Sequence, residues 1–187
     1  MREAGMRNEG VEPWLRGTLT DVEPVRRAVL HTLELAREDV DRWCEELSEE
    51  EMFARPFGLP PVAFQLRHIG RSLDRLLTYA EIGTVTSPEL RCDERRGLSE
   101  AQMAALTTEM DSGTAVEVME EFRMGLERAM ERVRGVAPET FAEVRGVGRK
   151  MLPTTVAGLL IHCAEHTQRH VGQMVTTVKV VKAGRMP

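Results

Sequence analysis

The sequence has few aromatic residues, few cysteines and no long apolar run, and each absence excludes a class of protein. Aromatic residues make up only 4% of the 187 residues, and this favours helices over sheets because strands draw on aromatic and β-branched side chains. The three cysteines are widely spaced and form no CxxC pair, which excludes a cysteine-rich zinc site and argues against a disulfide framework. No segment approaches the roughly eighteen apolar residues that a membrane-spanning helix needs.

The charge balance is acidic. The chain carries 25 basic and 30 acidic residues, a net charge of −5 with histidine neutral, and this gives no general electrostatic basis for binding nucleic acid or an anionic membrane. The first ten residues are charged and lack the apolar region of a signal peptide. Only three of the basic residues are lysines, as is common in proteins from GC-rich bacterial genomes. We therefore expect a soluble bacterial protein of the cytoplasm.

Four segments show the three-and-four spacing of apolar residues that is typical of amphipathic helices. They span residues 24–47, 62–82, 115–133 and 155–181. The run VTTVKVVK at the C-terminal end of the fourth segment also suits a strand, so this boundary stays open. A chain of this length buries enough surface to fold without a disulfide or a metal. Four long helices in one chain predict an all-α four-helix bundle.

The connections contain weaker signals. Residues 48–51 and 99–102 both fit a capping box, a hydroxyl followed three positions later by Glu or Gln, and each predicts a short extra helix. Residues 84–97 are charged and predict a loop, and residues 136–153 contain glycines and prolines and predict a long crossing. We expect residues 1–13 to be a flexible N-terminal segment and residues 14–187 to be a single domain.

Three of the five histidines lie in the fourth segment at successive gaps of four: His162, His166 and His170. Residues four apart on a helix are neighbours about 5–6 Å apart, and this spacing lets one helix offer two imidazoles to one metal ion. At 100° per residue, His170 lies about 50° from the centre of the apolar stripe, His166 about 90° and His162 about 130°. His166 and His170 are therefore the better ligands, and His162 is either an outer partner or a bystander. Gln173 lies one turn beyond His170 on the same side.

A metal site in a bundle takes ligands from facing helices, so a third ligand should come from another segment. His31 lies roughly opposite the apolar stripe of the first segment, and we expect it to be solvated. His68, near the start of the second segment, shares a face with Phe64, Ser72 and Arg75 and lies away from the leucine stripe. Helical phase alone leaves the choice of His68 open.

Two runs of sequence resemble the motifs of a known family. The run Val62-Ala-Phe-Gln-Leu-Arg-His68-Ile-Gly-Arg resembles the first ligand motif of the DinB/YfiT-like superfamily, and His162-Cys-Ala-Glu-His166-Thr-Gln-Arg-His170-Val-Gly-Gln173 resembles its closing motif, HxxxHxGQ. The resemblance extends from about Trp14 to Val181 and implies a DinB-like four-helix bundle. It implies that His68, His166 and His170 bind one divalent metal ion, usually zinc or nickel, with iron, cobalt and manganese as alternatives. It also implies a homodimer.

Known members of this superfamily include thiol transferases that use bacillithiol, relatives that depend on mycothiol, and many proteins of unknown activity. Three neutral imidazoles leave a coordination position open, which is typical of catalytic sites, and a metal there can deprotonate a coordinated thiol. The leading hypothesis is therefore a metal-dependent enzyme that transfers a low-molecular-weight thiol to a small electrophile. Gln173 and His162 would support the ligands from outside, and the sequence identifies no further catalytic residue.

Three alternatives remain open. The first is a metal-dependent hydrolase that uses bound hydroxide, and the second is a non-enzymatic bundle for binding or dimerisation. The third follows from the run His162-Cys-Ala-Glu-His166, which matches the HxxEH signature of inverted zinc proteases. It would make His162 and His166 the ligands and Glu165 the general base, but helical phase places Glu165 on the outer face.

Four arginines and a cysteine belong to the same two segments as the histidines. Arg67, Arg71, Arg75 and Arg169 either border a pocket for an anionic substrate or are ordinary surface residues. Cys163 falls on the apolar stripe, which predicts a buried small side chain and not a nucleophile.

Overall fold

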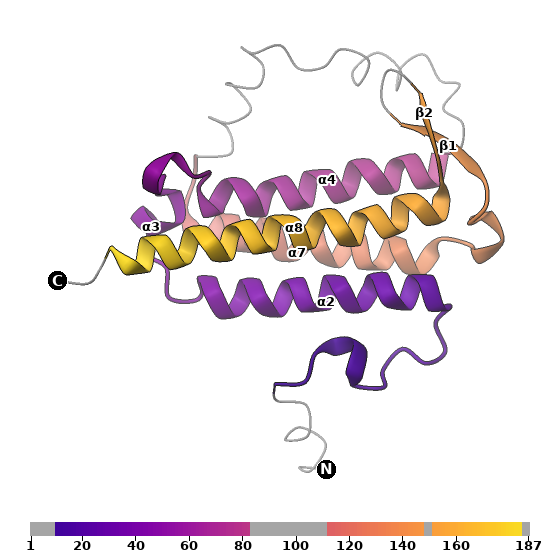
Figure 1. The fold of residues 1–187 in the computed structure, drawn as a ribbon, viewed down its shortest axis with the longest axis horizontal. Helices are drawn as coiled ribbons and strands as arrows, with labels where there is room; N and C mark the ends of the chain where they lie inside the picture. The colour runs from indigo at the N-terminus through magenta and orange to yellow at the C-terminus, as the bar shows by residue number, and fades with distance from the viewer. Residues whose placement is uncertain (1–9, 83–111, 148–150, 185–187) are drawn as a thin grey trace.

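Four long helices lie side by side and form the body of the molecule (Figure 1). The computed structural model describes residues 10–82, 112–147 and 151–184. Its long helices are α2 (Pro24–Cys44), α4 (Val62–Ile82), α7 (Ala115–Gly135) and α8 (Val156–Ala183). The predicted four-helix bundle is confirmed, and the VTTVKVVK run is helical because α8 continues to Ala183. Within the described ranges, no helix has the length and apolarity needed to cross a membrane.

Each long helix packs against two others: α8 against α2 and α4, and α7 against α4 and α2. Helices α4 and α8 run in opposite directions (Figure 1). Two hydrogen bonds agree with this arrangement: the Thr177 hydroxyl donates to the Pro60 carbonyl, and His170 Nδ1 contacts Gln65 Oε1. The start of α4 therefore lies along the C-terminal half of α8.

Side chains cap the helices where the sequence places acceptors. The Ser48 capping box is confirmed: its hydroxyl accepts from the Glu51 N–H, the Glu51 carboxylate accepts from the Ser48 N–H, and the short helix α3 (Glu49–Phe53) follows. Thr114 forms the same motif at the start of α7, and Thr155 caps α8. Each cap is worth about 1 kcal/mol. The second predicted capping box, at 99–102, and the predicted loop at 84–97 lie outside the described residues.

The core is built from the apolar stripes of all four helices. Its largest fully buried side chains on these helices are Leu30, Leu33, Leu66, Ile69, Leu73, Leu77, Phe122, Leu126, Leu160 and Met174. Burial of each such side chain contributes about 1.5–3 kcal/mol relative to its exposure to water. This packing holds α4 and α8 rigidly against each other, which fixes the side chains along their shared seam.

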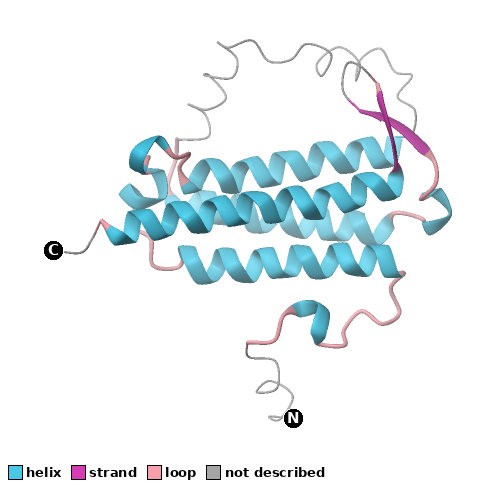
Figure 2. Cartoon of the chain, viewed as in Figure 1, coloured by secondary structure: helices cyan, strands magenta, loops and turns pink. Residues whose placement is uncertain are grey.

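The predicted crossing at 136–153 has more structure than the sequence indicated. A short 3₁₀ helix, η3 (Pro138–Thr140), precedes strands β1 (Val144–Val147) and β2 (Leu152–Thr155), which pair antiparallel. Figure 2 shows the two strands at the end of the bundle where α8 begins. Arg145 attaches this hairpin to the bundle, because its buried guanidinium donates to the Ala80 carbonyl at 3.2 Å. This contact between distant segments leaves no local sequence pattern.

The prediction that His31 is solvated is wrong. The 3₁₀ helix η1 (Pro13–Leu15) and the chain after it pack on α2, and His31 is only 6% exposed. Its Nε2 lies 3.2 Å from the Thr18 hydroxyl, so the imidazole is buried and hydrogen-bonded. The outer face of α2 is covered by the preceding chain, which the helical phase of α2 alone does not reveal. A further 3₁₀ helix, η2 (Pro56–Gly58), lies between α3 and α4.

Candidate metal centre

Three imidazoles meet at the seam between α4 and α8. His68 comes from α4, and His166 and His170 come from successive turns of α8. Each offers one ring nitrogen, and these three atoms lie within 4.8 Å of one another. The His68 and His166 Nε2 atoms are 3.1 Å apart, and the His166 and His170 ring centroids are 4.5 Å apart. The three histidines implied by the sequence resemblance therefore form one partly buried cluster that could hold a metal ion.

The neighbours of His68 resolve the choice that helical phase left open. One turn earlier on α4, Phe64 stacks on the His68 ring, with centroids 5.6 Å apart and an interplanar angle of 14°. One turn later, the Ser72 hydroxyl lies 3.3 Å from His68 Nε2, and Ser72 itself is buried. The face that carries these residues is directed at α8, beside the leucine stripe, because α4 packs against two helices and not one.

Gln65 also contacts the cluster, although its role was not predicted from the sequence. Its side chain is 1% exposed, and its Oε1 lies 2.6 Å from His170 Nδ1. An amide oxygen only accepts, so Nδ1 carries the proton and Nε2 of His170 is the ring atom left for a ligand bond. Gln65 precedes His68 by three positions. A polar residue in the otherwise apolar start of this helix was the sequence signal that could have indicated its role. Gln173, which the sequence favoured for this role, is exposed but also hydrogen-bonds His170.

His162 remains at the edge of the cluster. Its ring centroid lies 5.6 Å from that of His166, its side chain is 44% exposed, and its Nδ1 lies 3.3 Å from Glu165 Oε2. Glu165 is also exposed and accepts a short hydrogen bond from Arg169. The structure therefore does not bring His162 into the ligand group, and it leaves Glu165 on the outer face, away from the role of general base that the HxxEH alternative requires.

The imidazoles of the cluster are neutral at physiological pH. Burial, together with the neighbouring imidazoles and two arginines of α4, lowers the pKa of His68 to about 4. Burial and positive neighbours also lower the pKa of His166 to about 4. Burial lowers the pKa of His170, and a hydrogen bond to the Gln173 side chain opposes this shift. Neutral imidazole is the form that binds a metal ion.

The donor set fits a divalent transition metal. Zinc bound tetrahedrally at about 2.0–2.1 Å places neighbouring ligand atoms roughly 3.3 Å apart, and the His68 and His166 nitrogens are 3.1 Å apart. Imidazole suits zinc, nickel, copper and iron, whereas magnesium and calcium prefer oxygen ligands. Three protein ligands also leave a coordination position open, as in catalytic zinc sites.

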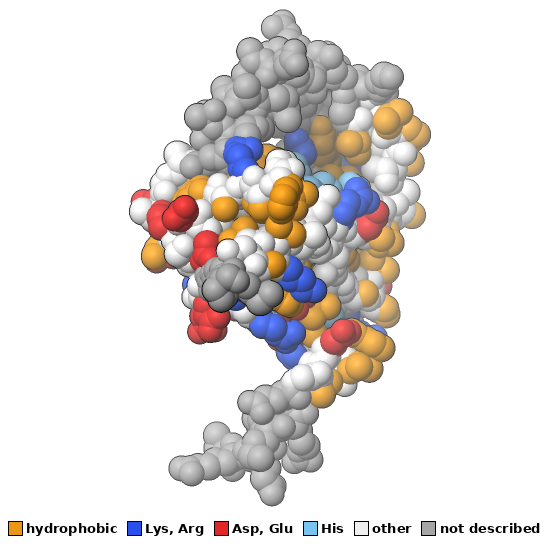
Figure 3. Space-filling view, turned by 60° about the vertical axis from the view of Figure 1, so that its left-hand side comes forward, with side chains coloured by type: hydrophobic (Ala, Val, Ile, Leu, Met, Phe, Trp, Pro, Cys, Tyr) orange, Lys and Arg blue, Asp and Glu red, His pale blue; other side chains and the backbone are white. Residues whose placement is uncertain are grey.

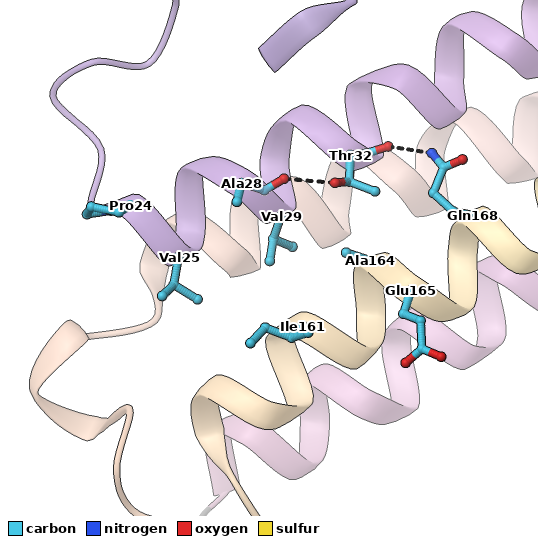
Figure 4. Close-up of a pocket in the computed structure, with 9 residues that line it drawn as sticks. All are labelled: Pro24, Val25, Ala28, Val29, Thr32, Ile161, Ala164, Glu165 and Gln168. Carbon is cyan, nitrogen blue, oxygen red and sulfur yellow. Dashed lines mark hydrogen bonds between the residues drawn. The ribbon is translucent and has the colours of Figure 1, made fainter.

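A separate apolar groove lies on the other side of α8. Its volume is about 520 Å³, and its walls come from α2 and α8 (Figure 4). Its lining includes Val25, Val29, Ile161 and Ala164, and the Gln168 amide closes one end by donating to a backbone carbonyl of α2. No histidine lines this groove. Helix α8 therefore presents the imidazoles to α4 and an apolar wall to α2.

The fold and the cluster together define a class of protein, the four-helix bundles in which histidines of two facing helices form a group that could hold a metal ion. A comparison with family models matches residues 32–174 to the DinB superfamily. This match covers most of the chain and includes all three histidines of the cluster, so the chain belongs to the DinB superfamily. Comparisons with curated proteins and with solved structures found no match.

Proposed function

We propose that this protein is a metal-dependent enzyme that transfers a low-molecular-weight thiol to a small electrophile. The observation that carries the proposal is the group of three imidazoles whose ligand atoms lie within 4.8 Å of one another. Membership of the DinB superfamily supports it, because the superfamily includes thiol transferases. In this proposal His68, His166 and His170 hold the metal.

The chemistry that a divalent ion supplies at such a position is Lewis acidity, which lowers the pKa of a coordinated thiol. The chain supplies the geometry. Gln65 fixes the tautomer and orientation of His170, and Phe64 and Ser72 hold the ring of His68 from either side. The seam between α4 and α8 partly buries the cluster, which strengthens electrostatic interactions there relative to bulk water.

Thiol transfer is favoured over hydrolysis by the composition of the cluster. Among the described residues its ligand group consists of three imidazoles, and Glu165, the carboxylate nearest to it along α8, is occupied by His162 and Arg169. A hydrolase commonly positions a carboxylate as general base for the attacking water. A thiol that has lost its proton is already a strong nucleophile and needs no such base.

Metal content tests the first part of the proposal. We expect untagged protein to contain one divalent metal ion per chain by inductively coupled plasma mass spectrometry, and a His166→Ala/His170→Ala variant to contain none. A His162→Ala variant is the matched control, because this histidine lies outside the ligand group, and it should keep its metal. Absence of metal from the wild-type protein after incubation with excess zinc and nickel would refute the site.

Thiol conjugation tests the second part. The metal-loaded protein is assayed against a panel of electrophiles with several low-molecular-weight thiols, and the product is identified by mass spectrometry. We expect conjugation that depends on bound metal and disappears in the His166→Ala/His170→Ala variant. A stoichiometric metal content without conjugation of any thiol would contradict the transferase activity while leaving the metal site intact.

A further inference from the structure

A buried hydroxyl lies at the edge of the imidazole cluster. Ser72 follows His68 by about one turn of α4, and only 2% of it is exposed. Its Oγ lies 3.3 Å from His68 Nε2, the same atom that lies 3.1 Å from His166 Nε2. The hydroxyl therefore lies beside the ring nitrogen that His68 turns towards the other ligands.

The direction of this hydroxyl differs from that of other hydroxyls in the helices of this protein. Thr32, Thr78 and Thr176 each donate to the backbone carbonyl four residues earlier, at 2.8–2.9 Å, which is a common arrangement for a hydroxyl inside a helix. In the part of the chain that the structure describes, Ser72 makes no such bond, and its hydroxyl contacts the imidazole. Ser72 therefore forgoes a local backbone partner for a contact with the cluster.

Metal binding by His68 would remove this partner. A neutral imidazole offers a single lone pair, so Nε2 cannot accept from Ser72 and bind an ion at the same time. Because Ser72 is buried, bulk water does not replace the lost acceptor, and an unpaired buried hydroxyl costs free energy. A new acceptor close to Nε2 would remove this cost.

The open coordination position offers a place for such an acceptor. Neighbouring ligands of a tetrahedral zinc ion lie roughly 3.3 Å apart, and Ser72 Oγ is at this distance from His68 Nε2. A group bound at the same ion is therefore within reach of the hydroxyl. The cluster is also accessible from outside, because its three histidines are only partly buried and histidine side chains are visible at the surface (Figure 3).

We propose that the Ser72 hydroxyl donates a hydrogen bond to the sulfur atom of the thiol that reacts at the imidazole cluster. This inference rests on the proposed function and adds a residue that positions the nucleophile. A thiolate accepts a hydrogen bond from an O–H group, and a bond to a charged acceptor is stronger than one to a neutral acceptor. The proton stays on Ser72, so the contact stabilises the negative charge of the sulfur without a proton transfer.

Cobalt-loaded protein tests this contact without an activity assay. Cobalt(II) commonly replaces zinc, and a coordinated thiolate gives a sulfur-to-cobalt charge-transfer band. We expect a Ser72→Ala variant to bind cobalt with the wild-type stoichiometry and to bind mercaptoethanol, a neutral thiol, at least about tenfold more weakly, as loss of a hydrogen bond to a charged group predicts. Its charge-transfer band should move to longer wavelength, because the sulfur lone pairs lose a stabilising donor.

Two matched controls separate this contact from a general defect of the cluster. Imidazole binds an ion through its only lone pair and cannot accept from Ser72 at that atom, so wild type and Ser72→Ala should bind it equally. Thr167→Val removes a hydroxyl that follows His166 on α8; this hydroxyl is buried and, among the described residues, has no hydrogen-bond partner. The Thr167→Val variant should keep the wild-type affinity for mercaptoethanol and an unshifted band.

Weaker mercaptoethanol binding with a shifted band in Ser72→Ala, and unchanged imidazole binding, supports the inference. Equal mercaptoethanol affinities of wild type and Ser72→Ala, or a loss without a band shift, overturn it and leave the proposed function intact. Loss of cobalt or imidazole binding in Ser72→Ala, or an equal effect in Thr167→Val, also overturns it, because the hydroxyl would then only support the cluster. A wild-type protein that binds cobalt but no thiol refutes the proposed function, and this inference with it.

Discussion

Replacement of Gln65 by leucine should weaken metal binding without dismantling the bundle. Leucine has a similar volume and removes the oxygen that lies 2.6 Å from His170 Nδ1. Gln65 is 1% exposed, so no bulk water replaces the lost acceptor. The His170 ring then loses the contact that selects its tautomer and orientation, and Nε2 is no longer held in the form that binds a metal.

The size of the effect follows from the burial of this contact. Loss of a hydrogen-bond partner behind a ligating histidine typically lowers metal affinity 10–100-fold, which corresponds to about 1.4–2.8 kcal/mol. The short distance and the full burial place Gln65 at the upper end of this range. The unpaired Nδ1–H also lowers the free energy of unfolding by about 1–3 kcal/mol. Competition with a chromophoric chelator measures the affinity, and urea unfolding measures the stability.

Two matched variants separate the proposed role from a general packing defect. Gln65→Glu keeps an acceptor for Nδ1 and should retain most of the wild-type affinity. Gln168→Leu removes the same chemical group from the α2 side of α8, where the amide donates to the Thr32 carbonyl, and should leave metal affinity unchanged. Equal affinity of wild type and Gln65→Leu, with both proteins folded, would refute the reasoning.

Two further predictions concern protons and thiols. The metal-free protein should lose stability as the pH falls from about 6.5, the ordinary histidine pKa, towards about 4, the lowered pKa of His68 and His166. The reason is that the unfolded chain binds more protons than the folded chain in this pH window. Thermal unfolding should show a shallower loss of stability with falling pH in a His166→Gln variant, and equal slopes in variant and wild type would contradict this cause. Burial raises the pKa of both the Cys44 and the Cys163 thiol to about 12. Peptide mapping after maleimide treatment should therefore find both cysteines unlabelled in the native protein and labelled in urea. Labelling of Cys163 in the native protein would show that the seam opens.

The four helices could be predicted because their signals are local. The apolar spacing of each helix, the capping hydroxyls and the flanking prolines all lie within a few turns of the chain. The β1–β2 hairpin was not predicted, since Arg145 holds it through a carbonyl of α4 that is distant in sequence. His31 was misplaced for the same reason: the chain around Thr18 covers it, and the periodicity of α2 carries no information about that cover.

The candidate site shows the same division between local and distant information. His166 and His170 are neighbours on one helix, so their spacing alone indicated a site. The position of His68 relative to the other two histidines depends on how α4 is rotated against α8. Helical phase did not determine this rotation, and only the resemblance to a family implied that His68 is the third ligand. Gln65 lies in the same first turns of α4, but its role is defined by His170 on the facing helix. Sequence spacing does not encode that distance.

The arrangement of the three imidazoles bears on what they can bind. Two neutral rings whose Nε2 atoms lie 3.1 Å apart share at most one hydrogen bond, and the nearby Ser72 hydroxyl competes for the same atom of His68. Protonation would relieve this convergence of nitrogen atoms, but burial and the neighbouring arginines hold the pKa values of His68 and His166 at about 4. A divalent metal ion accepts several lone pairs at once and does not need a proton. The imidazoles therefore stay neutral near neutral pH, and neutral imidazole is the form that binds a metal ion.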